Sequence, residues 1–385
     1  MNNFVKISGN VRKPKPVFTG DDYFPVIIAS TGLTLASDNV DKELKKAKTA
    51  ISAGADIITD HSLTDNIELI HNLMAESIET PISCIAIYEV AVLAKQNANY
   101  ISGDKMIKML ECQAKRGMDI VTIHATAFRD DVSLLKENQR LIPCTSRGGT
   151  MMLEILQSTR EENPYWLFFD DVLDIAQKYS LSLSLGTCYR PASVCDIGDV
   201  NDLYFLEMKR MAELIKRAKE KNVGIIVEGI GHAPINRIPD IIMKSKEICL
   251  NAPYRVLTVA TDIALGYDHI SSAIASSTAV YNGANMITCV SRSEHIGLPS
   301  ESDLLEAVIS SRIAAHCGYS ARTNDFSKDY IMSKARNAVG CYGQIEASIY
   351  PQGAEEAIKR HKFGDEKLCS MCGAFCALAA NDRLL

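Results

Sequence analysis

Two similar six-residue phrases occur in the sequence, GADIIT at residues 54–59 and GMDIVT at residues 117–122. Each phrase starts with a glycine, the residue that most often ends a helix in the left-handed conformation, and continues into a run typical of a β-strand. Helical patterns precede the two phrases, over residues 41–53 and 105–116. Helix, glycine and strand in this order predict β/α units and a parallel sheet.

Eight short apolar runs alternate with helical segments along the chain. They cover residues 26–29, 56–60, 82–87, 120–124, 181–185, 224–228, 256–261 and 285–289. An open doubly wound sheet is the alternative, but the count of eight and the absence of a GxGxxG turn after the first strand argue against it. From about residue 322 the alternation stops. We therefore expect an α/β protein: a (β/α)8 TIM barrel over residues 1–321, followed by a helical C-terminal segment over residues 322–385.

The composition excludes several classes of protein. A net charge of -6 argues against nucleic acid as a partner, because such binding depends on Lys and Arg. No apolar run approaches the roughly 18 residues that span a bilayer, and the first residues lack the apolar core of a signal peptide. Nine of the twelve cysteines stand singly, as small buried hydrophobes do. We expect a soluble cytoplasmic protein that binds neither nucleic acid nor a membrane.

Polar side chains follow seven of the eight predicted strands. They include Asp60, His61, Tyr88, His124, Thr187, Arg190, Glu228, Asp262 and His295. One polar residue at a strand end is usually a cap or a solvated loop residue. Seven strand ends of this kind predict an active site, because a (β/α)8 barrel carries its chemistry at the C-terminal ends of its strands.

Two histidines at this face are candidate metal ligands. His232 lies in EGIGHAP (residues 228–234) and His295 in SEHIGLP (residues 293–299). Imidazole nitrogen suits zinc or ferrous iron, and substrate or water would fill the remaining positions. The alternative is that each is an ordinary loop histidine.

The segment SRGG, from Ser146 to Gly149, opens a predicted helix after the fourth strand. Backbone N–H groups at a helix start, together with the guanidinium of Arg147, suit a phosphate group. A glycine-rich turn with a surface arginine is an equally open interpretation.

Three cysteines lie close together near the end, in CSMCGAFC at residues 369–376. A structural zinc site needs a fourth ligand, and the nearest candidate, His361, lies eight residues upstream of Cys369. Three thiolates suit a [4Fe–4S] cluster with one open iron, which can bind and reduce S-adenosylmethionine. Zinc and redox-active thiols are the alternatives.

Several of these segments, taken together, resemble a known protein family. The motifs that carry the resemblance are TIHA (122–125), SRGG (146–149), YRP (189–191), VEGIGHAP (227–234), TDIALGYDHISS (261–272), EHIGLP (294–299), SKAR (333–336) and CSMCGAFC. They resemble the phosphomethylpyrimidine synthase (ThiC) family of radical S-adenosylmethionine enzymes from about residue 24 to the end.

The resemblance implies a barrel enzyme that acts on 5-aminoimidazole ribotide with a low-potential electron donor, usually as a homodimer. It implies a second metal, zinc or iron, at His232 and His295, and a [4Fe–4S] cluster at Cys369, Cys372 and Cys376. The substrate-binding positions would be Tyr88, His124, Ser146, Arg147, Gly148, Arg190 and Glu228, with Asp262 at the seventh strand end beside them. Glu228 and His124 would be catalytic and manage protons around the imidazole.

Several positions depart from the family pattern. Three residues instead of four separate Cys372 from Cys376, Thr187 replaces a carboxylate, and Cys289 replaces a tyrosine. Such changes suggest 5-hydroxybenzimidazole, for the lower ligand of anaerobic cobamides (vitamin B12), as the product. The alternatives are the phosphomethylpyrimidine of thiamine biosynthesis, or a non-catalytic partner subunit of a two-component synthase.

Overall fold

Eight parallel strands close into a barrel in the computed structural model, which describes residues 4–96, 101–196, 202–339, 342–361 and 371–384. The strands are β3 (Val26–Thr31), β4 (Ile57–Asp60), β5 (Ile82–Ile85), β6 (Ile120–Ile123), β7 (Ser182–Leu185), β8 (Ile225–Glu228), β9 (Tyr254–Val256) and β10 (Met286–Thr288). Neighbours in sequence are neighbours in space, and β10 pairs with β3 to close the ring. The predicted TIM barrel is confirmed.

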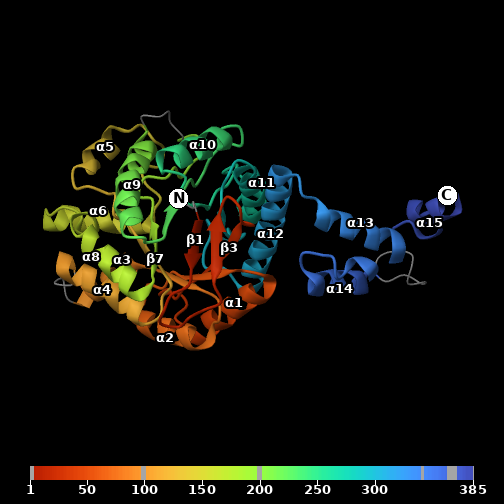
Figure 1. Cartoon of the computed structure of the whole chain (residues 1–385), viewed down its shortest axis with the longest axis horizontal. Helices are drawn as coiled ribbons and strands as arrows, with labels where there is room; N and C mark the ends of the chain where they lie inside the picture. Colours follow the sequence, from red (N-terminus) through yellow and green to blue (C-terminus); the bar gives the residue numbers. More distant parts are fainter. Residues whose placement is uncertain (1–3, 97–100, 197–201, 340–341, 362–370, 385) are drawn as a thin grey trace. The chain divides into compact units, whose positions relative to one another are not determined.

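Helices surround the barrel, and the strands lie inside them (Figure 1). The helices of this part are α1 (Val40–Ala53), α2 (Ile67–Ser77), α3 (Ala86–Gln96), α4 (Gly103–Lys115), α5 (Asp131–Glu137), α6 (Arg147–Thr159), α7 (Pro164–Leu167), α8 (Phe169–Tyr179), α9 (Leu203–Glu220), α10 (Ile238–Ile248), α11 (Asp268–Tyr281) and α12 (Glu301–Thr323). Gly54 and Gly117 follow α1 and α4 with φ of 104° and 95°, which confirms the predicted helix ends.

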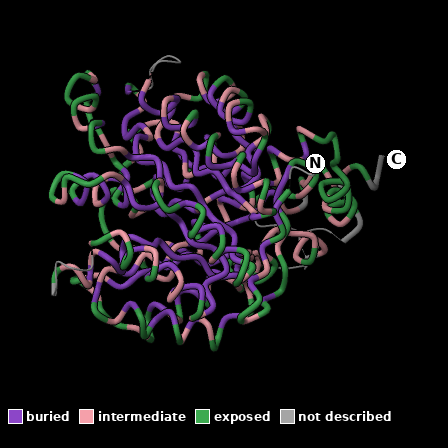
Figure 2. The backbone as a smooth tube through the Cα atoms, turned by 60° about the vertical axis from the view of Figure 1, so that its left-hand side comes forward, coloured by how far each residue is buried: buried purple, intermediate pink, exposed green. Residues whose placement is uncertain are grey.

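The apolar strand residues build two layers of core. Most buried apolar side chains pack between the strands and the helices, and the buried backbone is concentrated there (Figure 2). A smaller cluster fills one end of the barrel, where Val5 and Ile7 of β1 (Phe4–Ile7) contact strand residues such as Ile57 and Ile226. The hairpin of β1 with β2 (Val17–Gly20) thus contributes to closing the end where the strands begin. The open end is the one at which the strands finish.

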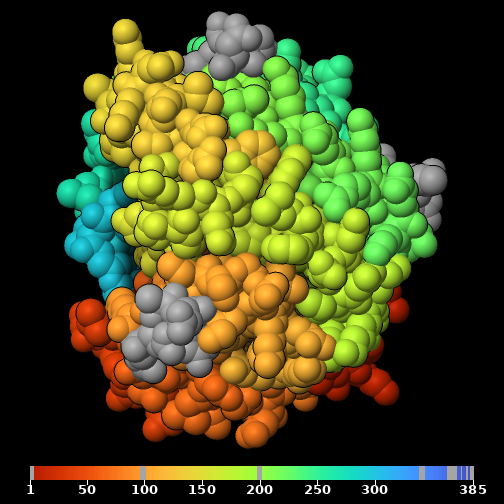
Figure 3. Space-filling model, turned by 90° about the vertical axis from the view of Figure 1, so that its left-hand side faces the viewer, coloured from red at the N-terminus to blue at the C-terminus, as the bar shows by residue number. Residues whose placement is uncertain are grey.

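The helices also form the outer surface of the barrel. Figure 3 shows side chains of the orange, yellow and green segments, from the first part of the chain, packed side by side over one face. Among the described helices, none is long and apolar enough to cross a membrane.

The chain divides into two units, residues 1–319 and residues 320–385. The second unit contains the end of α12, then α13 (Ser327–Val339), the 3-10 turn η2 (Tyr342–Gln344), α14 (Pro351–Arg360), the 3-10 turn η3 (Gly373–Phe375) and α15 (Ala377–Leu384). Its described elements are helical, and it carries Cys372 and Cys376 on either side of η3.

Candidate active site

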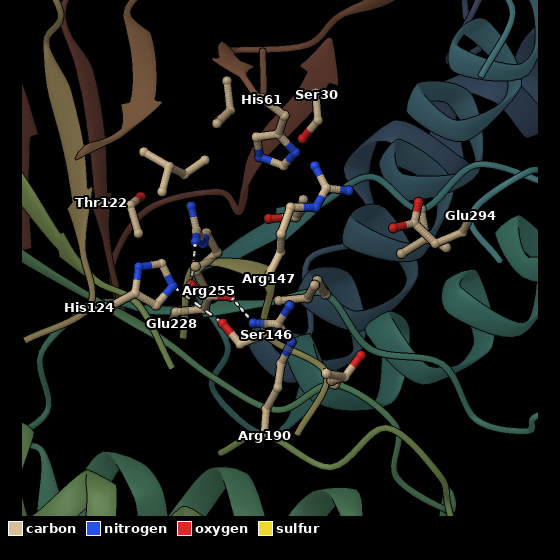
Figure 4. Close-up of a pocket in the computed structure, with 18 of the residues that line it drawn as sticks. Ser30, His61, Thr122, His124, Ser146, Arg147, Arg190, Glu228, Arg255 and Glu294 are labelled. Carbon is tan, nitrogen blue, oxygen red and sulfur yellow. Dashed lines mark hydrogen bonds and ion pairs between the residues drawn. The ribbon is translucent and has the colours of Figure 1, made fainter. Parts of the chain in front are cut away.

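A cavity of about 290 Å³ opens at the C-terminal ends of the barrel strands (Figure 4). Nine of the predicted site residues line it, namely Tyr88, His124, Ser146, Arg147, Gly148, Arg190, Glu228, His232 and His295. They come from different β/α units, so the closure of the barrel brings them together. Asp262 does not line the cavity.

Glu228, the last residue of β8, lies between two arginines. Its Oε1 atom is 2.6 Å from Nη1 of Arg190, and its Oε2 atom is 3.0 Å from Nη2 of Arg255. Burial would raise the pKa of Glu228, but the two guanidinium groups outweigh burial and hold the pKa below its usual value. Glu228 is therefore a carboxylate, which can only accept hydrogen bonds.

His124, directly after β6, is a buried neutral imidazole. Burial lowers its pKa to about 4, and Arg190 and Arg255 act in the same direction against Glu228. Its Nε2 atom is 3.3 Å from the hydroxyl of Ser146, and its Nδ1 atom has no hydrogen-bond partner among the described residues. A buried ring nitrogen without a partner is available to a ligand.

Gly148 allows the start of α6 to approach His124. A Cβ atom on Gly148 would lie 2.1 Å from Cε1 of the imidazole, far inside van der Waals contact, so only glycine fits there. Ser146 caps the helix, because its hydroxyl accepts from the backbone N–H of Gly149 at 3.1 Å.

Arg147 occupies the first turn of α6, and its side chain is exposed. Its guanidinium lies 5.7 Å from the ring centre of Tyr88 and has no carboxylate partner in the described part of the chain. A helix start and a guanidinium without a carboxylate partner are the elements of an anion site. The structure thus places the SRGG segment at the cavity rather than on the outer surface.

His232 and His295 point their Nε2 atoms at each other across 3.3 Å. Each ring also has a carboxylate behind it: Nδ1 of His232 is 2.6 Å from Asp262, and Nδ1 of His295 is 3.0 Å from Asp268. Because a carboxylate only accepts, Nδ1 carries the proton in both rings, and the neutral Nε2 atoms face each other with their lone pairs.

This arrangement fits a metal ion between the two rings. Two nitrogens bound to one zinc ion at about 2.0–2.1 Å with tetrahedral angles lie about 3.3–3.4 Å apart, which is the separation of the two Nε2 atoms. Carboxylates behind ligating histidines are the usual outer partners. No group of three or more His, Cys, Asp or Glu suited to a metal occurs among the described residues. Among the described residues, His232 and His295 would therefore be the only His, Cys, Asp or Glu ligands of this metal ion.

Of the three terminal cysteines, Cys369 lies outside the described residues. Cys372 is exposed and Cys376 is partly exposed, and Gly373 between them has φ of 50°. Apolar side chains beside the thiols are also exposed, with Met371 at 90% and Phe375 at 94%. Three thiols at this spacing in the sequence fit an iron–sulfur cluster by their donor chemistry, and the two that the structure describes are accessible.

Two of the residues named from the sequence lie away from the cavity wall. The carboxylate of Asp262 accepts from His232 and from the backbone and hydroxyl groups of residues 193–194, and its contact with substrate stays a prediction. The replacement at Cys289 is one of the changes that suggest another product, but Cys289 belongs to the core between strands and helices, while Thr288 and Val290 line the cavity. Side chains alternate along a strand, so a change at Cys289 does not alter the cavity wall directly.

Three residues of the site were not predicted from the sequence: Arg255 and Glu294, which line the cavity, and Asp268, which contacts His295. Arg255 interrupts the apolar run YRVLTVA, and a charged residue inside a barrel strand needs a partner, which was the available signal. Asp268 gave no signal of its own, because its contact with His295 depends on the tertiary structure.

The chain is similar in sequence to one known family. The sequence model of the radical SAM ThiC family matches residues 3–383. A phosphomethylpyrimidine synthase of Methanocaldococcus jannaschii is 36% identical over 99% of this chain and 91% of its own length. One of Thermococcus gammatolerans is 38% identical with the same coverage. Among solved structures, a dihydropteroate synthase of Coxiella burnetii gives a TM-score of 0.48 at 13% identity, over 83% of this chain and 99% of that one.

Proposed function

Because the chain belongs to the radical SAM ThiC family, we propose that it rearranges 5-aminoimidazole ribotide to the phosphomethylpyrimidine of thiamine biosynthesis. The names of its relatives favour this product over 5-hydroxybenzimidazole, which the sequence analysis placed first. The observation that carries the proposal is the cavity. It combines an anion site at the start of α6 with a carboxylate and a neutral imidazole that suit a polar ring.

Cys369, Cys372 and Cys376 would hold the [4Fe–4S] cluster through their thiolates. When bound, the cluster supplies the electron that cleaves S-adenosylmethionine and so yields the 5′-deoxyadenosyl radical. The chain therefore depends on a low-potential electron donor. The homodimer that the resemblance implies is part of the proposal.

Arg147 and the first N–H groups of α6 would bind the phosphate of the ribotide. The helix start favours negative charge, and the guanidinium adds a charge-assisted hydrogen bond. Gly148 keeps this backbone against His124, so the bound phosphate fixes the ligand close to the imidazole.

Glu228 and His124 would orient the imidazole of the substrate. Held as a carboxylate by its two arginines, Glu228 accepts from the amino group, whereas the free Nδ1 atom of His124 exchanges a hydrogen bond with the ligand. With a pKa of about 4, His124 stays neutral around pH 7 and adds no positive charge to the site.

His232 and His295 would hold the second metal, zinc or iron, with Asp262 and Asp268 fixing their rings. At this edge of the cavity, such an ion would orient S-adenosylmethionine or substrate through the open coordination positions.

5-Hydroxybenzimidazole is the second candidate product, and one observation favours it. Thr187, which stands where the resemblance places a carboxylate, accepts from Arg190 at 3.3 Å, so a neutral hydroxyl contacts that arginine at this position. The position of Cys289 outside the cavity removes another argument for a changed product.

The test is an anaerobic reaction of the reconstituted full-length protein with 5-aminoimidazole ribotide, S-adenosylmethionine and dithionite, read by mass spectrometry. The phosphomethylpyrimidine mass is the expected result, and the hydroxybenzimidazole mass would support the second candidate. The Cys372→Ala variant, treated in the same way, is the control for product that does not depend on the cluster. Formation of neither product by the cluster-loaded protein would refute the proposal.

A further inference from the structure

Arg255 is a buried charge in the barrel wall, and its side chain is only 10% exposed. It stands opposite Glu228 in the register of β9 with β8, and its Nη2 atom is 3.0 Å from Oε2 of that residue. The ion pair holds the guanidinium at the cavity, as Figure 4 shows. A planar guanidinium fixed at one nitrogen presents its remaining N–H groups in defined directions.

Buried hydroxyls without a partner among the described residues line the cavity on both halves, including that of Thr122 on β6, but the half opposite β6 combines three of them with an arginine. The Nε atom of Arg255 is buried and has no partner among the described residues, and neither have the hydroxyls of Ser30, Thr59 and Thr288. All four side chains line the cavity, and they come from β9, β10, β3 and β4, which are consecutive strands of the barrel. The phosphate-binding elements follow β6, on the other half.

Buried donors of this kind indicate a ligand rich in acceptor oxygens, because leaving them unpaired costs free energy. Arg255 already pairs with Glu228, so its Nε–H group suits a neutral oxygen better than a second anion. In a ribotide, the imidazole offers one good acceptor nitrogen. The ribose offers two hydroxyls and the ring oxygen, and hydroxyls both donate and accept, as serine and threonine do.

We propose that Arg255, with the hydroxyls of Ser30, Thr59 and Thr288, forms the sugar-binding wall of the cavity and selects ligands that carry a ribose. This inference rests on the proposed function, since it assigns the ribose of the ribotide to this half of the barrel. Arg255 is then a specificity-determining residue. The phosphate is bound on the opposite half, at Arg147.

The test compares two probes, ribose 5-phosphate and inorganic phosphate, by titration calorimetry on the full-length protein. The wild type should bind ribose 5-phosphate more tightly. Arg255→Gln should weaken ribose 5-phosphate about tenfold or more, the effect of one lost hydrogen bond to a charged group, and change phosphate by no more than about twofold. Arg147→Gln is the matched control, and it should weaken both probes alike.

Folding is controlled within the same design. Glu228 keeps Arg190 in the Arg255→Gln variant, so its carboxylate remains paired. Arg255→Lys retains a positive charge but lacks the Nε–H group, and it should show the same selective loss. A loss of folded protein would weaken both probes together, whereas the ratio of the two dissociation constants reports the sugar contact alone.

In an Arg255→Gln protein whose circular dichroism spectrum and unfolding midpoint match those of the wild type, equal weakening of both probes would make Arg255 a phosphate ligand and overturn the inference. Unchanged binding of ribose 5-phosphate would also overturn it. A third titration uses 5′-deoxyadenosine; if Arg255→Gln weakens this probe and leaves ribose 5-phosphate unchanged, the wall belongs to the adenosyl ribose and the inference is overturned. The proposed function can fail while this inference holds. That is the case if Arg255→Gln weakens only ribose 5-phosphate but the anaerobic reaction of the cluster-loaded protein yields neither product.

Discussion

The stability of the barrel should depend on pH through His124. Its pKa is about 4 in the folded chain and about 6.5 in an unfolded one. Between these values the unfolded chain binds more protons, so stability falls as the pH drops through this window. At pH 5 the loss relative to pH 7.5 is about 2 kcal/mol.

The measurement is the unfolding midpoint of the full-length protein at several pH values, for the wild type and for His124→Asn, which cannot titrate there. Over the barrel unit, residues 1–319, about 1 kcal/mol corresponds to about 1.5 °C. The wild type should therefore lose about 3 °C more than the variant between pH 7.5 and pH 5. Asn39→Ala is the control: it removes the cap of α1, whose side chain accepts from the backbone N–H of Lys42 at 2.9 Å, lowers stability by about 1 kcal/mol at every pH, and keeps the pH dependence.

A constant difference between wild type and His124→Asn across this range would refute the reasoning. It would mean that His124 takes up its proton in the folded protein as easily as in the unfolded one. The buried environment described here would then be wrong.

Three further predictions concern the other parts of the site. Gly148→Ala should lower the unfolding midpoint by about 2–4 °C, because overpacking against His124 costs about 1–3 kcal/mol. In a His124→Gly background the same substitution should cost nothing, and an equal cost in both backgrounds would contradict this contact. Asp262→Asn should weaken metal binding about 10–100-fold, which is measured as the metal content after dialysis against a chelator. If the variant retains as much metal as the wild type, Asp262 does not support the metal site. Cys372→Ala should abolish 5′-deoxyadenosine formation without changing the unfolding midpoint of the barrel; deoxyadenosine formed by the variant would disprove the cluster assignment.

The sequence alone determined the fold and the location of the site. Helix periodicity, the glycines that end α1 and α4, and eight β-branched runs are local signals, and local backbone preferences decide them. Since the strands of a barrel end at one face, the polar residues after them could be assigned to one cavity before any distance was known.

Only the tertiary structure decided which of these residues touch. Whether a strand residue faces the cavity depends on its exact register, and a shift of one residue reverses the side, as Thr288 and Cys289 show. The pairing of Arg255 with Glu228 arises from the register of two strands. The carboxylate behind His295, from Asp268, lies 27 residues away in the chain, and no local pattern encodes such a distance. These contacts exist because the barrel closes and brings remote strand ends within hydrogen-bonding distance.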